Sequence, residues 1–201
     1  MNEICSTHRK VTSYSPDSVP PLLCPDLQPA VLVHQNPWFK VMSRDSFFTL
    51  EYDEPQVVVL PILDNHSIIM IRVKRPVIGD VPLELPAGGS YKGESPRMAT
   101  MRELAEETGI VITDPDRFVP ELPFGEMPGR IPVLLSVFRV DVTKAEYEAR
   151  RSHDNEVVSV EAVTFGDAVR KITSGEIYLT SPTAIIARFL FDNDHTSREK
   201  A

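Results

Sequence analysis

Residues 88–110 read GGSYKGESPRMATMRELAEETGI and carry the strongest structural signal in the chain. A helix is expected over residues 96–108, ended by the glycine that follows it. At about 100° per residue, Glu103, Glu106 and Glu107 fall on one face within one turn. The opposite face carries mainly apolar side chains: Met98, Met101, Leu104 and Ala105. We therefore expect the apolar face to pack on a sheet while the other face gathers negative charge.

The three glutamates of this helix need a counter-charge. Carboxylates about 5–6 Å apart repel one another by roughly 3 kcal/mol per pair at an effective dielectric near 20. Arg102 offsets part of this repulsion, but no Lys or Arg follows any of the three glutamates at four-residue spacing. A solvated acidic face is the alternative interpretation. The all-oxygen donor set favours a bound Mg²⁺, with Mn²⁺ as a second choice.

The loop before the helix is rich in glycine. Gly88, Gly89 and Gly93 allow the backbone to approach a ligand closely or to offer a carbonyl to a metal. The same glycines are expected in any tight turn that leads into a helix. Beside a carboxylate face they indicate a phosphate-bearing ligand that is bridged by a metal ion.

The spacing of these residues resembles the signature of the Nudix hydrolase family at every fixed position. The matching residues are Gly88, Glu94, Arg102, Glu103, Leu104, Glu106, Glu107, Gly109 and Ile110. The resemblance implies the Nudix fold, an α+β protein in which helices flank a mixed β-sheet as an α/β/α sandwich. The interspersed strand and helix patterns along the chain favour the same fold class.

The resemblance also implies roles for individual residues. Metal ions would be held by Glu103 and Glu107, by Glu106 as a further ligand, and by the Ala87 carbonyl. Arg102 would orient these carboxylates, and the catalytic set would include Glu106 and Arg102. Glu94 would play a supporting role in the site. Its alternative interpretation is an acid near the start of the helix that interacts favourably with the helix dipole. In the implied reaction water attacks one phosphorus of a diphosphate, and the metal ions neutralise the developing charge.

The run Glu84-Leu-Pro-Ala-Gly-Gly89 resembles the ADP-ribose pyrophosphatase branch of the family, as does Pro128-Gly129 downstream. Glu84 and Gly88 are therefore expected to bind substrate. Arg75 resembles the arginine with which that branch contacts the phosphates. A surface basic residue at a strand end is the alternative interpretation of Arg75.

A late acidic loop is where the same branch places a general base. Glu156 is favoured for that role and Asp154 comes second, while an ordinary polar loop before a strand is the alternative. His153 is interpreted as uninvolved. In related dimeric enzymes the N-terminal part crosses to the partner, so we expect a homodimer. Trp38 would then stack on the adenine, with Phe39 and Tyr52 as alternatives; each of these aromatic residues also suits a core or an interface.

These features predict a Mg²⁺-dependent pyrophosphatase. Its substrate would be ADP-ribose or a related nucleoside diphosphate derivative, such as a nucleotide sugar, split into two monophosphates. One alternative is a house-cleaning pyrophosphatase for nucleoside triphosphates or dinucleoside polyphosphates. Another is a catalytically silent Nudix module that senses a nucleotide, which the presence of all three helix glutamates disfavours.

Composition limits the other function classes. The 201 residues carry 21 basic and 29 acidic side chains, a net charge of −8, which disfavours nucleic-acid binding through a basic surface. The most apolar stretch, residues 57–63, falls far short of the roughly 20 residues of a membrane span. No signal-peptide pattern opens the chain, so the two cysteines, Cys5 and Cys24, are interpreted as reduced thiols of a cytoplasmic protein.

The chain divides into three parts by composition. A proline-rich arm is expected over residues 1–40, a Nudix domain over 41–192 and a tail over 193–201. Strands are expected at residues 31–34, 47–52, 57–63, 67–73, 81–85, 133–142 and 157–165. Besides the acidic helix, further helices are expected at residues 166–174 and 181–191.

Overall fold

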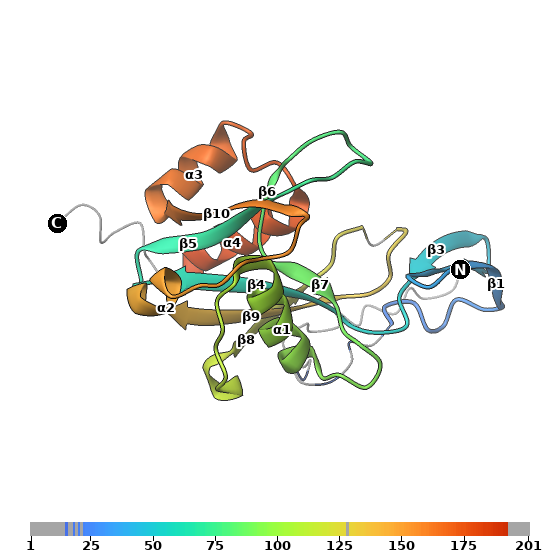
Figure 1. Ribbon diagram of the computed structural model, residues 1–201. Helices are drawn as coiled ribbons and strands as arrows, with labels where there is room; N and C mark the ends of the chain where they lie inside the picture. Colours follow the sequence, from blue (N-terminus) through green and yellow to red (C-terminus); the bar gives the residue numbers. More distant parts are fainter. Residues whose placement is uncertain (1–14, 16–17, 19, 21, 128, 193–201) are drawn as a thin grey trace.

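The computed structural model describes residues 15, 18, 20, 22–127 and 129–192. Its centre is a mixed seven-stranded sheet (Figure 1). The strands are β4 (Gln56–Leu63), β5 (Ser67–Val73), β6 (Leu83–Glu84), β7 (Ala87–Gly89), β8 (Val119–Phe124), β9 (Leu135–Val142) and β10 (Val157–Thr164). The order is β10-β5-β4-β9-β8, while β6 pairs with β5 and β7 pairs with β4. Only the β4–β9 pair of this sheet is parallel.

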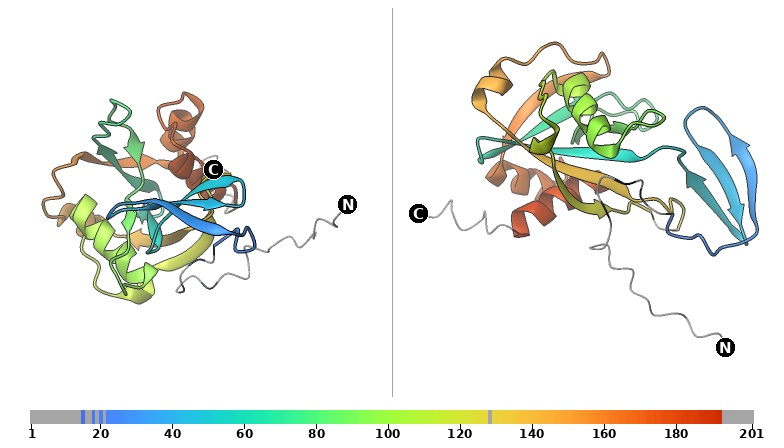
Figure 2. Two further views of the ribbon diagram at one scale, coloured as in Figure 1. Left: turned by 90° about the vertical axis from the view of Figure 1, so that its right-hand side faces the viewer. Right: turned by 90° about the horizontal axis from the view of Figure 1, so that it is seen from below.

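Helices cover both faces of this sheet (Figure 2). One face carries α1 (Pro96–Thr108), and the other carries α3 (Phe165–Thr173) and α4 (Thr180–Asp192). The short α2 (Lys144–Glu148) follows β9, and a 3₁₀ turn at Pro115–Arg117 precedes β8. The expected α/β/α sandwich is therefore confirmed, and its three longer helices lie within one or two residues of the expected ranges.

Alternate side chains of the central strands fill two cores. Val58 and Leu60 of β4 pack on the side of α3 and α4, where Ile186 joins them. Val59, between them in sequence, packs on the other side with Leu104 of α1. Because both faces of β4 and β5 are buried, these strands appear in the sequence as continuous apolar runs.

The strands expected at residues 57–63 and 67–73 form an antiparallel hairpin. Asp64 and Asn65 connect β4 to β5 with φ values of +48° and +52°. Two consecutive left-handed residues form the turn whose twist matches that of the flanking strands. The hairpin fixes the register in which Ile62 pairs with Ile68.

A second, three-stranded antiparallel sheet precedes the main one. It contains β1 (Ala30–Gln35), β2 (Lys40–Arg44) and β3 (Phe47–Glu51) in sequence order. Figure 1 shows it projecting from one side of the sandwich. Backbone hydrogen bonds tie it back to the body, for example from Leu50 N–H to the Arg130 carbonyl (2.8 Å).

The small sheet changes the grouping of the early strands. The strands expected at residues 47–52 and 57–63 lie in different sheets: β3 pairs with β2 in the small sheet, whereas β4 belongs to the main one. The boundary expected between residues 40 and 41 falls inside β2. The expected tail and residues 1–14, which include Cys5, lie outside the described residues.

The longest helices of the described residues, α1 and α4, have 13 residues each. Within the same residues, no helix is both long and apolar enough to cross a membrane. Cys24 carries a free thiol. The cytoplasmic location expected from the sequence stays a prediction.

Candidate active site

Local interactions fix both ends of α1. At the N-terminus the Ser95 side chain accepts a hydrogen bond from the Met98 N–H (3.3 Å), and Pro96 occupies the first turn. At the C-terminus Gly109 has φ +74°, a left-handed conformation that favours glycine. A Cβ on Gly109 would also lie 2.1 Å from the Arg151 carbonyl oxygen. These contacts fix the rotation of α1 and therefore the positions of its carboxylates.

The acidic face of α1 is less exposed than the sequence suggested. Glu103 is only 8% exposed, and Leu104 beside it is fully buried. Met98, expected on the packed face, is 48% exposed, so that expectation is wrong. The reason is that α1 contacts both β4 and β7, which moves its buried stripe towards Ala99, Thr100 and Glu103.

Arg102 lies at the centre of the acidic cluster. Its guanidinium donates hydrogen bonds to Glu94 (3.0 Å), Glu103 (2.7 Å), Glu106 (2.9 Å) and the Gly89 carbonyl (2.7 Å). It also stacks over the Tyr91 ring, 3.9 Å from the ring centroid. Arg102 therefore connects the helix to the glycine loop and orients the carboxylates beside it.

The backbone of β7 lies directly against two of the glutamates. The Ala87 N–H donates to Glu107 Oε2 at 2.8 Å, and a Cβ on Gly88 would lie 2.2 Å from Glu103 Oε1. Burial raises the pKa of Glu107 to about 8 and also raises the pKa of Glu103. Desolvation is the largest cause of both shifts, so the ionised form of these carboxylates is costly unless a cation compensates it.

The donor set fits a hard dication. Within the described part of the chain, no group of three Asp, Glu, His or Cys side chains is already arranged to hold a metal ion. Arg102 instead occupies Glu103 and Glu106. The donors available beside β7 are carboxylate and carbonyl oxygens, which Mg²⁺ and Mn²⁺ prefer. Together with the burial of Glu107, this donor chemistry suits a divalent cation.

The late acidic loop crosses the C-terminal end of α1. Arg151 N–H donates to the Gly109 carbonyl (2.8 Å), and Asp154 N–H donates to the Glu106 carbonyl (2.9 Å). The Glu156 carbonyl accepts from Lys74 N–H (3.0 Å), next to the end of β5. Contacts that span about 50 residues of sequence thus bring Glu156, whose side chain is exposed, close to the helix.

Arg75 and Glu84 form a bidentate ion pair. Arg75 Nε donates to Glu84 Oε1 at 2.8 Å, and Nη2 donates to Oε2 at 2.9 Å. This pairing raises the pKa of Arg75, and the charges of Glu107 and Glu156 add to the effect. Arg75 is thus held next to the acidic cluster, with 40% of its side chain exposed.

A cavity of about 550 Å³ lies between this part of the sheet and the N-terminal end of α4. Four of the residues expected in the site line it: Arg75, Glu84, Ala87 and Gly88. The helix glutamates do not, so the backbone of β7 separates them from the cavity and joins the two parts of the site. Further polar side chains in its wall are Tyr52, Gln56, Glu126, Thr180 and Ser181.

Sequence reasoning missed most of these further polar residues in the cavity wall. Ser181 donates a hydrogen bond to Glu126, and burial together with the Glu126 charge raises the pKa of Tyr52. Of these residues the sequence pointed only to Tyr52, because isolated polar residues far apart in the chain carry no sequence pattern. Trp38 does not line the cavity: it is 76% exposed in the turn between β1 and β2. Pro128 lies outside the described residues.

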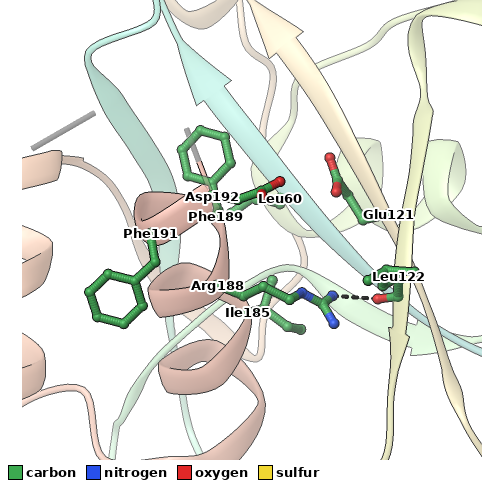
Figure 3. A pocket seen from close by; sticks show the side chains of 8 residues that line it. All are labelled: Leu60, Glu121, Leu122, Ile185, Arg188, Phe189, Phe191 and Asp192. Atoms are coloured by element: carbon green, nitrogen blue, oxygen red, sulfur yellow. Dashed lines mark hydrogen bonds between the residues drawn. The ribbon is translucent and has the colours of Figure 1, made fainter. Parts of the chain in front are cut away.

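A second cavity, of about 630 Å³, lies between β8 and the C-terminal half of α4 (Figure 3). Its lining is mostly apolar, and Arg188 crosses it to donate to the Leu122 carbonyl. No residue expected in the active site lines it. The first cavity, which touches Ala87 and Gly88, is therefore the one connected to the acidic cluster.

Comparisons with known proteins show which family the chain belongs to. Residues 53–180 match the NUDIX domain model. The chain is 32% identical to the ADP-ribose pyrophosphatase of Bacillus subtilis (strain 168) over 134 residues, which are 67% of this chain and 70% of that protein. It is 28% identical to the methanol dehydrogenase activator of Bacillus methanolicus over the same shares of the two chains. It is 44% identical to the ADP-sugar pyrophosphatase of Mus musculus over 57 residues, 26% of each chain.

The chain therefore belongs to the Nudix family, whose members are generally pyrophosphohydrolases. Family members typically use divalent metal ions and act on nucleotide derivatives. The acidic helix and the β7 backbone beside it lie within the matched residues.

Proposed function

We propose that this protein is a Mg²⁺-dependent pyrophosphatase that hydrolyses the diphosphate bond of ADP-ribose or a related nucleoside diphosphate derivative. The observation that carries the proposal is the cavity that contains Arg75 and reaches the acidic cluster through Ala87 and Gly88. Such a cavity suits a diphosphate with a bulky group on at least one side. The names of the relatives from Bacillus subtilis and Mus musculus support the same substrate class.

In this proposal the metal ions are held by Glu103, Glu106, Glu107 and the Ala87 carbonyl. When bound, they supply Lewis-acid stabilisation of the negative charge that develops on the diphosphate. Arg102 acts as a positioning residue, because it holds Glu103 and Glu106 in place through the hydrogen bonds described above.

Glu156 is proposed as the general base. Its loop is fixed against α1 by the Asp154–Glu106 backbone hydrogen bond, and the exposed carboxylate is free to take a proton from the attacking water. Asp154 is the second choice for this role. Arg75, oriented by Glu84, is proposed to bind the phosphate oxygens as a charged hydrogen-bond donor.

A homodimer formed through the small sheet is also proposed. Apolar side chains are exposed on β1 and β3: Val31, Leu32, Val33, Phe47 and Phe48. The register places Val31 and Phe48 on one face of the sheet and Leu32 and Phe47 on the other. Exposed apolar side chains of this kind are typical of a protein interface. Trp38, at the edge of the same sheet, would then reach the base of a nucleotide in the partner's site.

A substrate panel tests the proposed function. The purified protein is incubated with Mg²⁺ and with ADP-ribose, ADP-glucose, ATP and a dinucleoside polyphosphate, and the products are separated by chromatography. We expect AMP and ribose 5-phosphate from ADP-ribose, with slower or no cleavage of ATP. Preferred cleavage of ATP or of the polyphosphate would contradict the proposed substrate class. Failure to cleave any member would contradict the enzyme assignment.

A further inference from the structure

The cavity beside β7 has two chemically different ends. Glu84 lies on β6 at the end that holds Arg75, and Gly88 on β7 pairs with Val57 of β4. Continuing across the sheet, β4 pairs with β9 and β9 pairs with β8, which leads to the loop that carries Glu126. Three strand spacings, roughly 14 Å, separate β7 from β8. The end that holds the Arg75–Glu84 ion pair and the Glu126 end are therefore far enough apart to contact different parts of one ligand.

The opposite end of the cavity carries the acidic side chain of Glu126. Among the described residues Glu126 forms no ion pair, and its one side-chain hydrogen bond comes from the Ser181 hydroxyl. By contrast, Glu84 and Glu94 are each bound by an arginine. Ser181, in the first turn of α4, thus holds the Glu126 carboxylate in place at the cavity wall.

The free lone pairs of Glu126 define the group that this end can bind. An ionised carboxylate has about four acceptor positions, of which Ser181 uses one. The remaining positions accept hydrogen bonds from neighbouring hydroxyls, such as the vicinal pair of a pentose. A phosphate brought to the same place would be repelled by the negative charge and would meet no counter-charge from Glu126, Ser181 or Tyr52.

We propose that Glu126, positioned by Ser181, binds the hydroxyl groups of a sugar on one side of the substrate diphosphate and selects sugars without a further phosphate there. This inference rests on the proposed function and deepens it. It explains why one cavity contains both an arginine for phosphate oxygens and an acid that forms no ion pair among the described residues. It also disfavours polyphosphate substrates, whose additional negative charges would reach towards Glu126.

Two sugars of the substrate have this chemistry, the ribose of the nucleoside and the sugar on the other side of the diphosphate. Equilibrium titration of the full chain with AMP and with ribose 5-phosphate distinguishes them. We expect Glu126→Gln to weaken the binding of one of these products about tenfold, because it replaces hydrogen bonds to a charged acceptor, and to leave the other nearly unchanged. Glu148→Gln is the matched control, since Glu148 is an exposed acid that lines neither cavity.

Steady-state kinetics provide a second measurement. In Glu126→Gln we expect KM for ADP-ribose to rise more than kcat falls. Glu126→Lys should reduce the preference for ADP-ribose over its 2′-phosphorylated analogue about tenfold or more if the nucleoside ribose is the sugar bound. If the other sugar is bound, the same loss of preference should appear with an analogue phosphorylated on that sugar.

The inference is overturned if Glu126→Gln changes the binding of neither product, weakens both products equally, or behaves like Glu148→Gln. Binding of neither product by the unaltered protein overturns it as well. Failure of the proposed function looks different, because the unaltered protein would then cleave no diphosphate in the presence of Mg²⁺. Normal cleavage that is insensitive to substitution of Glu126 would remove this inference alone.

Discussion

Gly88 and Glu103 lie so close together that the residue type at position 88 limits where the Glu103 carboxylate can lie. The missing side chain of Gly88 leaves just enough room for the Glu103 carboxylate, and Arg102 holds that carboxylate from the other side. The acid is therefore almost fully buried although it belongs to the charged face of its helix. Such placement is costly without a cation and useful with one.

Gly88→Ala tests this arrangement directly. The new Cβ would lie 2.2 Å from Glu103 Oε1, so the carboxylate must move away. We expect Mn²⁺ affinity, measured by electron paramagnetic resonance, to fall about tenfold or more. Substitution of residues that merely orient a metal ligand already lowers metal affinity by that factor. Gly89→Ala is the matched control, since its Cβ would meet only the flexible Gln56 side chain, at 3.2 Å. Equal losses in both variants would contradict the proposed role of Glu103.

Glu107→Gln separates function from stability. We expect turnover to fall by about a hundredfold or more, because a Lewis-acid ligand is lost. In metal-free protein the raised Glu107 pKa of about 8 means that the folded state keeps a proton that the unfolded state loses near its ordinary value. The free energy of unfolding should therefore decrease as pH rises through this interval, and the variant should lack that decrease.

Chemical denaturation in the presence of a chelator, at several pH values between 5 and 8.5, measures the effect on stability. A variant with the same pH dependence as the unaltered protein would show that Glu107 is not the titrating group. A large loss of stability of the variant at all pH values would contradict the view that the Glu107 charge destabilises the metal-free protein.

At the scale of elements, the termini of helices show how the site is held. Gly109 ends α1 and also admits the Arg151 carbonyl, so the helix and the late acidic loop are packed through one residue. In α2, Thr143 and Glu146 form a capping box. The Glu146 carboxylate also binds Arg117 of the 3₁₀ turn, which ties α2 to the segment before β8.

The pH dependence of stability tests the Arg117–Glu146 ion pair between α2 and the 3₁₀ turn. The hydrogen bond from Arg117 is the main cause that lowers the Glu146 pKa to about 2. The stabilisation is present above the ordinary carboxyl pKa and is lost as pH falls towards 2, because protonation removes the charge that Arg117 binds. We expect Glu146→Gln to lower the free energy of unfolding at pH 7 by about 1–2 kcal/mol and to flatten its decline in acid.

Urea denaturation at pH 7 and at pH 3 measures this difference. Glu148→Gln on the same helix is the control: its contact with Lys144 is 3.7 Å long and exposed, so we expect a change below about 0.5 kcal/mol. Equal effects of the two substitutions would contradict a specific role for the Arg117–Glu146 pair.

At the scale of the whole molecule, the small sheet is the feature least explained by the fold of a single chain. Val31 and Phe48 lie on either side of Ser43 on one face, and their exposed fractions are 54% and 57%. The main sheet, in contrast, has helices on both faces (Figure 2). The proposed dimer would cover this apolar surface.

Phe48→Asp tests the proposed dimer. We expect the unaltered protein to sediment as a dimer at micromolar concentration and the variant to sediment as a monomer, since a charge in the centre of an apolar interface is strongly unfavourable. Val169→Asp, on the partly exposed surface of α3, is the control and should leave the mass unchanged. A monomeric unaltered protein would remove the dimer proposal and, with it, the proposed role of Trp38.

The sequence by itself determined those features that depend on neighbours along the chain. The helix over residues 96–108, its three glutamates and the hairpin at Asp64 and Asn65 follow from periodicity and turn chemistry, because both act over a few residues. Periodicity and turn chemistry did not predict strands β7 and β8. The first is only Ala-Gly-Gly, and the second contains Pro120 and Pro123, which an edge strand tolerates but which no strand pattern suggests.

Only the tertiary structure decided which of these residues meet. Burial of Glu103 under β7, the pairing of Arg75 with Glu84 and the approach of the Glu156 loop to α1 all join segments that pack through the sheet. Glu126 and Ser181 are 55 residues apart and belong to no recognisable motif. Their meeting depends on the order of β4, β9 and β8 and on the position of α4, which long-range packing sets and local sequence patterns do not encode.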